Sequence, residues 1–181
     1  SIFEAARIAS PSSAILFVGS SKEYDSNINA TVITEDIHPL PENFYGITKY
    51  SAELFGQQYV RQFGMKISFT RSFNHTGPGQ SPLFVCSDWA KQIVNIERGL
   101  SEPVLLTGSL EATIDFTDVR DVVDGYYRIL KYGKSGEVYN VCSGRGFTLE
   151  WILTYLTEKS SKKIEVRSEQ SKQRGHATNR Y

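Results

Sequence analysis

Hydrophobic and polar positions follow two different periods along the chain. A helical pattern covers residues 2–9, and a short apolar run typical of a strand covers residues 14–18. A long helical pattern then begins near Phe44 and ends before Gly64, a residue suited to the left-handed backbone that stops a helix. Strands that alternate with helices predict an α/β fold.

A further strand follows this helix, because Met65, Ile67 and Phe69 alternate with polar residues. It leads into a loop over residues 74–82 that contains glycine and proline. Open α/β sheets bind ligands outside the carboxyl ends of their strands. We therefore expect this loop to lie where a substrate binds.

The rest of the chain continues the alternation. Asp118 and Thr148 each precede a helical pattern, and their side-chain oxygens can cap its first turn. The further helices and strands are expected at residues 85–98, 104–106, 119–130, 138–141, 149–156 and 164–166.

Composition excludes some classes of protein. The chain has 181 residues, of which 40% are hydrophobic and 22% charged, as in ordinary globular domains. Its 20 basic and 20 acidic residues cancel, so no overall charge draws it to nucleic acid or to a membrane surface. Its apolar runs fall far short of the roughly 20 residues of a membrane helix. We expect a soluble protein with neither nucleic acid nor membrane as a partner.

Cysteine and histidine usage bears on location and on metal binding. Cys86 and Cys142 lack CxxC spacing and are too few for a secreted disulfide scaffold, so the cytoplasm is the expected location. His38, His75 and His176 are far apart, and no Cys/His cluster accompanies them. No metal site is expected.

Tyr45 and Lys49 lie four residues apart on the long helix, so they project from one face. An ammonium ion near a phenol favours the phenolate form, which makes the pair a usable general acid or base. Taken alone, this spacing also fits two solvated side chains. Ser20 and Ser21, which follow the first strand directly, strengthen the catalytic interpretation, because a strand-end hydroxyl can bind a substrate carbonyl oxygen.

Five segments resemble, in order and spacing, the extended short-chain dehydrogenases, or sugar-nucleotide epimerase/dehydratase family. They are VGSSKEY, YGITK, RSFNHTGPGQ, DFTDVRDVV and GEVYNVCSG. The resemblance implies a Rossmann-like doubly wound parallel sheet with a small C-terminal substrate-binding part. It also implies NADP or NAD as cofactor, a nucleotide sugar as substrate, and a homodimer. The segment FNHTGPGQ resembles the branch that reduces GDP-linked 4-keto-6-deoxyhexoses.

The resemblance also assigns catalytic roles. Tyr45 matches the catalytic acid/base, and Lys49 matches the residue that favours its phenolate and binds the nicotinamide ribose. Ser20 matches the hydroxyl that binds the carbonyl, with Ser21 as a close alternative.

Three more residues match binding positions of the family. Phe73 matches a position beside the nicotinamide, and Asn74 one beside the substrate. Arg174 matches an arginine that holds the diphosphate of the substrate, a role suited to a guanidinium fork.

Two departures from the family pattern bear on substrate and reaction. Ile114 stands where the family commonly has an arginine, which removes an expected phosphate contact. Dehydratases of the family place a glutamate two residues after the strand-end Ser/Thr, but here Lys22 holds that position and Glu23 follows it. Dehydration is therefore disfavoured.

The chain contains no glycine-rich turn of the GxGxxG type. We therefore expect a fragment that lacks the N-terminal dinucleotide-binding βαβ units. Residues 1–75 would form the C-terminal half of the Rossmann domain with the catalytic residues. Residues 76–181 would mix a substrate-binding region with returning Rossmann elements.

The predicted function is NAD(P)H-dependent reduction of the C4 keto group of a GDP-4-keto-6-deoxyhexose. One alternative is an NAD-dependent sugar-nucleotide 4-epimerase or a GDP-mannose 4,6-dehydratase. The epimerase would use the same Tyr45, Lys49 and Ser20. Another is a truncated, non-catalytic module that binds a nucleotide sugar or dimerises.

Overall fold

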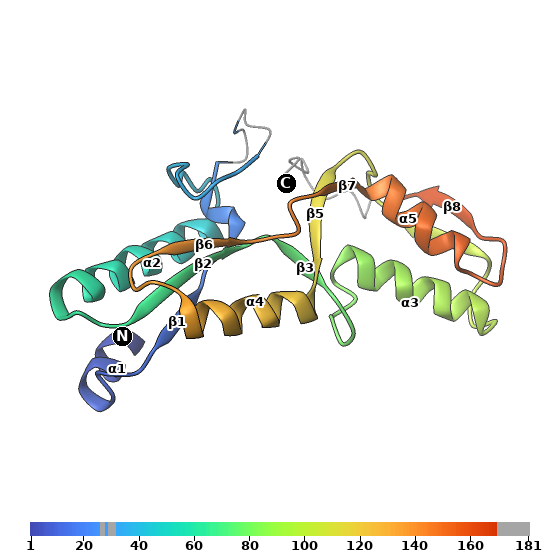
Figure 1. Cartoon of the computed structure of the whole chain (residues 1–181). Coiled ribbons are helices and arrows are strands. Elements are labelled where there is room, and N and C mark those ends of the chain that lie inside the picture. Colours follow the sequence, from blue (N-terminus) through green and yellow to red (C-terminus); the bar gives the residue numbers. More distant parts are fainter. Residues whose placement is uncertain (26–27, 29–31, 170–181) are drawn as a thin grey trace.

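The computed structural model describes residues 1–25, 28 and 32–169. It has two lobes that a narrow middle joins (Figure 1). The first lobe holds a parallel sheet in the order β1-β2-β6. Its strands are β1 (Ile15–Val18), β2 (Ile67–Ser72) and β6 (Val138–Val141). All three carboxyl ends therefore meet at one edge.

Helices cover both faces of this sheet, as in a doubly wound fold. On one face, α1 (Ile2–Ala9) and α2 (Phe44–Phe63) enclose a core of four buried residues. On the other face lies α4 (Val119–Tyr132), whose Tyr126 hydroxyl is 2.6 Å from Ser72 Oγ on β2. The core residues of the first face are Phe3, Met65, Ile67 and Phe69. This arrangement confirms the expected fold class.

The central strand β2 is buried on both faces, although its sequence alternates apolar and polar residues. Ile67 and Phe69 join the core beneath α1 and α2. Ser68 and Ser72 are also buried, and their hydroxyls bond the carbonyl of Lys134 and the hydroxyl of Tyr126. The alternation correctly predicted the strand, but it does not mark a solvent-facing side.

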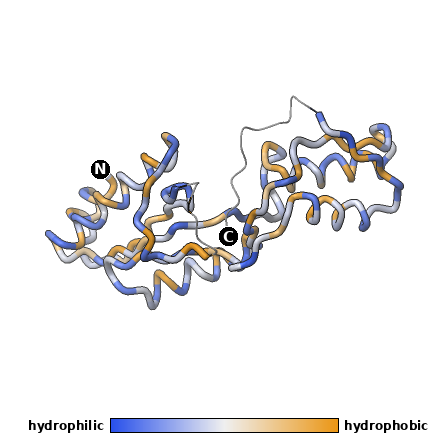
Figure 2. The backbone as a smooth tube through the Cα atoms, turned by 90° about the horizontal axis from the view of Figure 1, so that it is seen from above, coloured by the Kyte–Doolittle hydropathy of each residue, from blue (hydrophilic) through white to orange (hydrophobic). Residues whose placement is uncertain are grey.

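The second lobe has a core of its own around Trp89. It packs α3 (Val85–Glu97) and α5 (Leu149–Glu158) with the parallel pair β4 (Val104–Thr107) and β8 (Glu165–Ser168). Seen from above, the two lobes lie at opposite ends of the molecule (Figure 2). The core residues are Trp89, Ile93, Leu105, Ala112, Leu149 and Leu153.

A small sheet between the lobes was not predicted in full. It consists of β3 (Asn74–Thr76), β5 (Thr113–Asp118) and β7 (Gly146–Thr148), with β3 parallel and β7 antiparallel to β5. The segment expected to be a loop therefore begins with a strand. The three-residue strands β3 and β7 carry too little periodicity to be recognised. The six-residue β5 was not predicted either, and all three strands gain their hydrogen bonds from partners distant in sequence.

The expected helix caps are confirmed, although α4 and α5 each extend two residues beyond their expected ends. Gly64 ends α2 in the left-handed conformation, with φ of 65°. The side chain of Asp118 caps α4, and that of Thr148 caps α5. Among the described helices, none is long and apolar enough to span a membrane.

Candidate active site

The carboxyl edge of the first sheet gathers the predicted site residues. Ser20 follows the end of β1, and Phe73 follows the end of β2. Because β1 and β2 are parallel and paired from Ile15 to Val18, these two positions lie at the same edge. Ligands of open α/β sheets bind at this edge.

Ser20 caps the short 3-10 helix η1 (Ser21–Glu23). Its Oγ accepts a hydrogen bond from the Lys22 amide at 3.2 Å, and its own amide donates to Glu23 Oε1 at 2.7 Å. These reciprocal bonds form a capping box that fixes the turn. Because a hydroxyl has one proton to donate, Ser20 can still offer it to a carbonyl oxygen. Ser21, the alternative, is also buried and lies within η1.

Tyr45 and Lys49 stand in the first turns of α2, which the Asn43 side chain caps by accepting the Gly46 amide at 2.8 Å. Tyr45 is 55% exposed. The Lys49 ammonium lies 5.8 Å from the centre of the Tyr45 ring and donates to the Val18 carbonyl at 2.9 Å. Lys49 is thus held at the end of β1, with an exposed Tyr45 beside it.

Gly46 allows α2 to approach the Ser20 turn closely. A Cβ atom at this position would collide with the carbonyl oxygen of Lys22 and touch Pro41. Any larger residue would force α2 away from η1. The glycine in YGITK therefore brings the Tyr45/Lys49 pair up to the serine turn.

Of the predicted binding residues, two lie at the carboxyl edge. Asn74 is exposed at the start of β3. Phe73 is only 3% exposed and packs with Tyr24 and Ile33 in a small cluster. Arg174 lies outside the described residues.

Ile114 contributes no polar group. It is partly buried on β5 and packs against the core of the second lobe around Trp89. Asp115, the next residue, is fully buried and accepts the amides of Ser143 and Gly144 at 3.0 and 2.7 Å. This carboxylate holds the loop that follows β6, a structural role.

Sequence reasoning missed a buried ionic network directly behind the serine turn. Arg71 on β2 binds Glu53 on α2 through two hydrogen bonds, of 2.7 and 3.1 Å. Its Nε is 3.6 Å from Glu23 Oε2, and its Nη1 donates to the Tyr24 hydroxyl at 3.1 Å. A signal was available, because a charged residue in an otherwise buried strand requires a partner.

Burial raises the pKa of the Glu23 carboxyl to about 8, and the nearby Glu53 carboxyl acts in the same direction. The Ser20 amide and Arg71 oppose this change in pKa. Glu23 is fully buried, so its carboxyl points into the protein and not toward a substrate.

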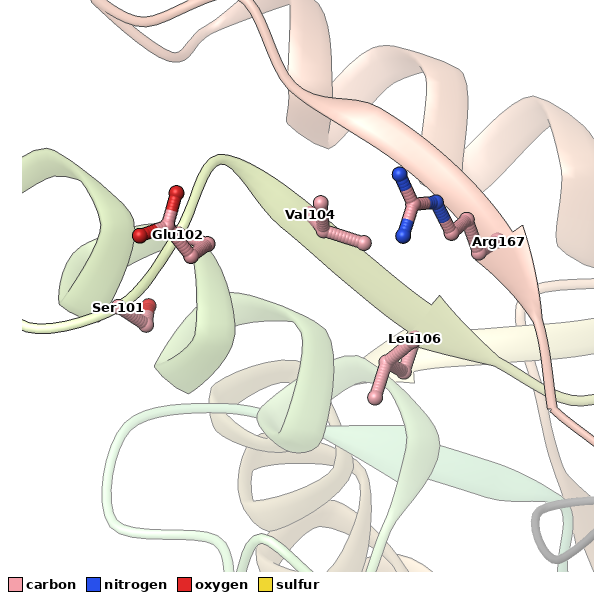
Figure 3. A pocket seen from close by; sticks show the side chains of 5 residues that line it. All are labelled: Ser101, Glu102, Val104, Leu106 and Arg167. Carbon is pink, nitrogen blue, oxygen red and sulfur yellow. The ribbon is translucent and has the colours of Figure 1, made fainter.

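One groove, of about 530 Å³, lies away from this edge, in the second lobe. Figure 3 shows its lining side chains beside β4 and β8. The guanidinium of Arg167, which lines the groove, forms an ion pair with the Glu165 carboxylate at 2.8 Å. The lining residues are Ser101, Glu102, Val104, Leu106 and Arg167. The groove brings together none of the predicted site residues.

A doubly wound sheet with serine, tyrosine and lysine at its carboxyl edge is the arrangement expected from the resemblance to the extended short-chain dehydrogenases. The family model described as the NAD dependent epimerase/dehydratase family matches residues 1–142. The chain belongs to this family, and its cofactor is accordingly NADP or NAD.

Named relatives agree with this assignment. The chain is 34% identical to GDP-6-deoxy-D-mannose reductase of Pseudomonas aeruginosa, over 91% of the chain and 57% of the relative. It also matches the structure of RMD from Pseudomonas aeruginosa complexed with NADPH, with a TM-score of 0.92 and 31% identity, over 99% of this chain and 60% of that one. The UDP-glucose 4-epimerase of Thermotoga maritima with UDP-glucose matches with a TM-score of 0.82 and 25% identity, over 99% of this chain and 56% of that one. The chain therefore spans less than two thirds of the length of these relatives.

Proposed function

We propose that the protein carrying this chain reduces the C4 keto group of a GDP-linked 4-keto-6-deoxyhexose with NAD(P)H. The observation that carries the proposal is the placement of Tyr45 and Lys49 beside the Ser20 turn. The likeness to GDP-6-deoxy-D-mannose reductase over 91% of the chain supports this particular substrate.

The donors at this edge fit a bound dinucleotide. The Lys49 ammonium has three N–H donors. One of them donates a hydrogen bond to the Val18 carbonyl, which leaves two for the hydroxyls of a ribose. When bound, NAD(P)H supplies the hydride that reduces C4. Tyr45 is exposed, and the centre of its ring lies 5.8 Å from this ammonium.

In the proposed reaction, Ser20 donates a hydrogen bond to the C4 carbonyl oxygen, where negative charge develops. Tyr45 gives its hydroxyl proton to this oxygen, so that the alkoxide becomes the product hydroxyl. Lys49 stabilises the phenolate left on Tyr45. Solvent then returns the proton to Tyr45.

The position of Glu23 argues against dehydration. A dehydratase needs a carboxyl group that faces the sugar, but Glu23 is fully buried and bonded to the Ser20 amide. Lys22, at the position of the family glutamate, has no carboxyl group.

A sugar-nucleotide 4-epimerase is the second candidate, which the likeness to UDP-glucose 4-epimerase supports. It would use the same Ser20, Tyr45 and Lys49 but return the hydride to the opposite face of C4. Such an enzyme retains its cofactor through purification, whereas the proposed reductase consumes NAD(P)H.

The experiment is to supply the full-length protein with NADPH and GDP-4-keto-6-deoxymannose, follow NADPH absorbance and identify the product. Oxidation that yields a GDP-6-deoxyhexose supports the reductase. Tightly bound NAD together with interconversion of C4 epimers would instead establish the epimerase. Binding of the nucleotide sugar without turnover would favour the non-catalytic module.

We further propose that the protein acts in the cytoplasm as a homodimer and that Arg174 holds the substrate diphosphate. Phe55 and Phe63 on α2 are 66% and 46% exposed, which leaves apolar surface for a second copy. Sedimentation of the full-length protein tests the dimer. Loss of affinity for GDP in an Arg174→Ala variant tests the phosphate contact.

A further inference from the structure

A single buried guanidinium connects the two halves of the candidate active site. Arg71 is 4% exposed and lies on β2, between the serine turn and α2. It binds Glu53 on α2 at 2.7 and 3.1 Å, and the same Nε atom that donates to Glu53 lies 3.6 Å from Glu23 Oε2 of the serine turn. By contrast, partly or fully exposed side chains form the ion pairs of Arg7, Arg120, Arg128 and Arg167.

One partner of Arg71 is bonded to a catalytic candidate, and another lies on the helix that carries the other two. Glu53 follows Lys49 by one helical turn and Tyr45 by two, so it shares their face of α2. Glu23 accepts the amide of Ser20 at 2.7 Å and closes its capping box. A displacement of Arg71 would therefore change the position of Ser20 relative to Tyr45 and Lys49.

A third connection fixes the guanidinium itself. Its Nη1 donates to the Tyr24 hydroxyl at 3.1 Å, and this hydroxyl donates to Asn140 Oδ1 on β6 at 2.8 Å. Arginine presents its donors in a rigid planar fork, so bonds from Nε and Nη2 to Glu53 and from Nη1 to Tyr24 fix both its position and its orientation. Lysine would keep the charge but lose this geometry.

Stability alone does not account for such a network. Desolvation of buried charges offsets most of their attraction, and apolar side chains of similar volume often serve as well. Here the fit is also incomplete, because Glu23 Oε2 is buried without a hydrogen-bond partner. What apolar packing could not reproduce is the directional pairing of Arg71 with Glu53 on α2 close to the Glu23 carboxyl of the serine turn.

We propose that Arg71 is a positioning residue, which through Glu23 and Glu53 sets the position of the Ser20 hydroxyl relative to Tyr45 and Lys49. This inference rests on the proposed function, since it assigns these three residues to catalysis. Arg71 does not touch the substrate; it acts through the residues that do.

The kinetic test compares Arg71→Lys in two backgrounds of the full-length protein. With Ser20 present, kcat and kcat/KM should fall together by roughly 10²-fold, as for a misplaced catalytic group. In a Ser20→Ala background the same change should cost less than about threefold, because no hydroxyl remains to be misplaced. Equal losses in both backgrounds would overturn the proposal.

Ser135→Ala is the matched control. Ser135 forms two hydrogen bonds at the opposite end of β2, to the Met65 carbonyl at 2.8 Å and from the Ile67 amide at 3.3 Å. Its loss should lower stability and leave kcat unchanged. A comparable fall in kcat in this control would show that destabilisation explains the effect of Arg71→Lys, and would overturn the proposal.

Amide hydrogen exchange gives a readout that needs no turnover. In Arg71→Lys, the peptide that contains Ser20 and Glu23 should exchange at least about tenfold faster, whereas Ser135→Ala should leave it unchanged. Unchanged exchange in Arg71→Lys would overturn the positioning role. If the unmodified protein shows no turnover, the proposed reaction fails, and the exchange result alone decides whether Arg71 holds the turn.

Discussion

Lys49 donates a hydrogen bond from its ammonium to the carbonyl oxygen of Val18, at 2.9 Å. Val18 is the last residue of β1, and the Ser20 turn follows it directly. The bond therefore fixes the lysine of α2 against the strand that carries the serine. It places the ammonium 5.8 Å from the centre of the Tyr45 ring.

Tyr45→Phe should reduce kcat of the full-length reductase by roughly 10²- to 10⁴-fold, because it removes the proton donor and leaves the ring in place. Since Tyr45 is 55% exposed, the thermal midpoint should hardly change. Steady-state NADPH oxidation and thermal denaturation measure the two effects. Unchanged turnover would remove Tyr45 from the mechanism.

Lys49→Met should lower kcat and also weaken cofactor binding, because one ammonium serves the phenolate and the ribose. Lys131→Met is a suitable control, since Lys131 lies on α4 over the rings of Tyr127 and Tyr132. NADPH titration and turnover should both be normal in the control. A Lys49→Met variant with normal NADPH affinity would contradict the ribose contact.

Gly46→Ala should destabilise the fold by about 1–3 kcal/mol, because the added methyl group collides with the Lys22 carbonyl. Activity should fall as well, since α2 must move away from the serine turn. Gly125→Ala on α4 is the matched control: its Cβ would meet only Val141, at 3.9 Å, so it should be neutral or stabilising by up to about 1 kcal/mol. Urea denaturation with an activity assay distinguishes the two, and a Gly46→Ala variant as stable as the control would refute the close contact.

Stability should decrease as pH rises through the range in which Glu23 titrates. Its pKa is raised from 4.5 to about 8 in the fold, chiefly by burial. The folded state therefore holds a proton that the unfolded state releases, and stability is highest below the unfolded pKa and falls until pH passes about 8. Between the unfolded and the folded pKa, the free energy of unfolding decreases by about 1.4 kcal/mol per pH unit.

Glu23→Gln should remove most of this dependence. The amide keeps an oxygen to accept the Ser20 amide but does not ionise. The free energy of unfolding should be measured by urea denaturation from about pH 5 to about pH 9. An equal decrease in the variant and the unmodified protein would show that another group titrates.

The sequence by itself determined the main elements and the placement of the candidate pair Tyr45 and Lys49. Tyr45 and Lys49 are four residues apart on a helix, so local geometry alone places them on one face. Gly64, Asp118 and Thr148 end or cap their helices through backbone groups of their own neighbourhood. Signals of this kind need no distant partner, which is why they could be predicted.

Only the tertiary structure decided how distant segments meet. Arg71, Glu53 and Glu23 are far apart in sequence, and their side chains meet because α2, β2 and the serine turn pack together. The short strands β3, β5 and β7 likewise exist through hydrogen bonds to each other. Burial then set the protonation of Glu23, since desolvation depends on everything that surrounds a carboxyl group and not on its neighbours in the chain.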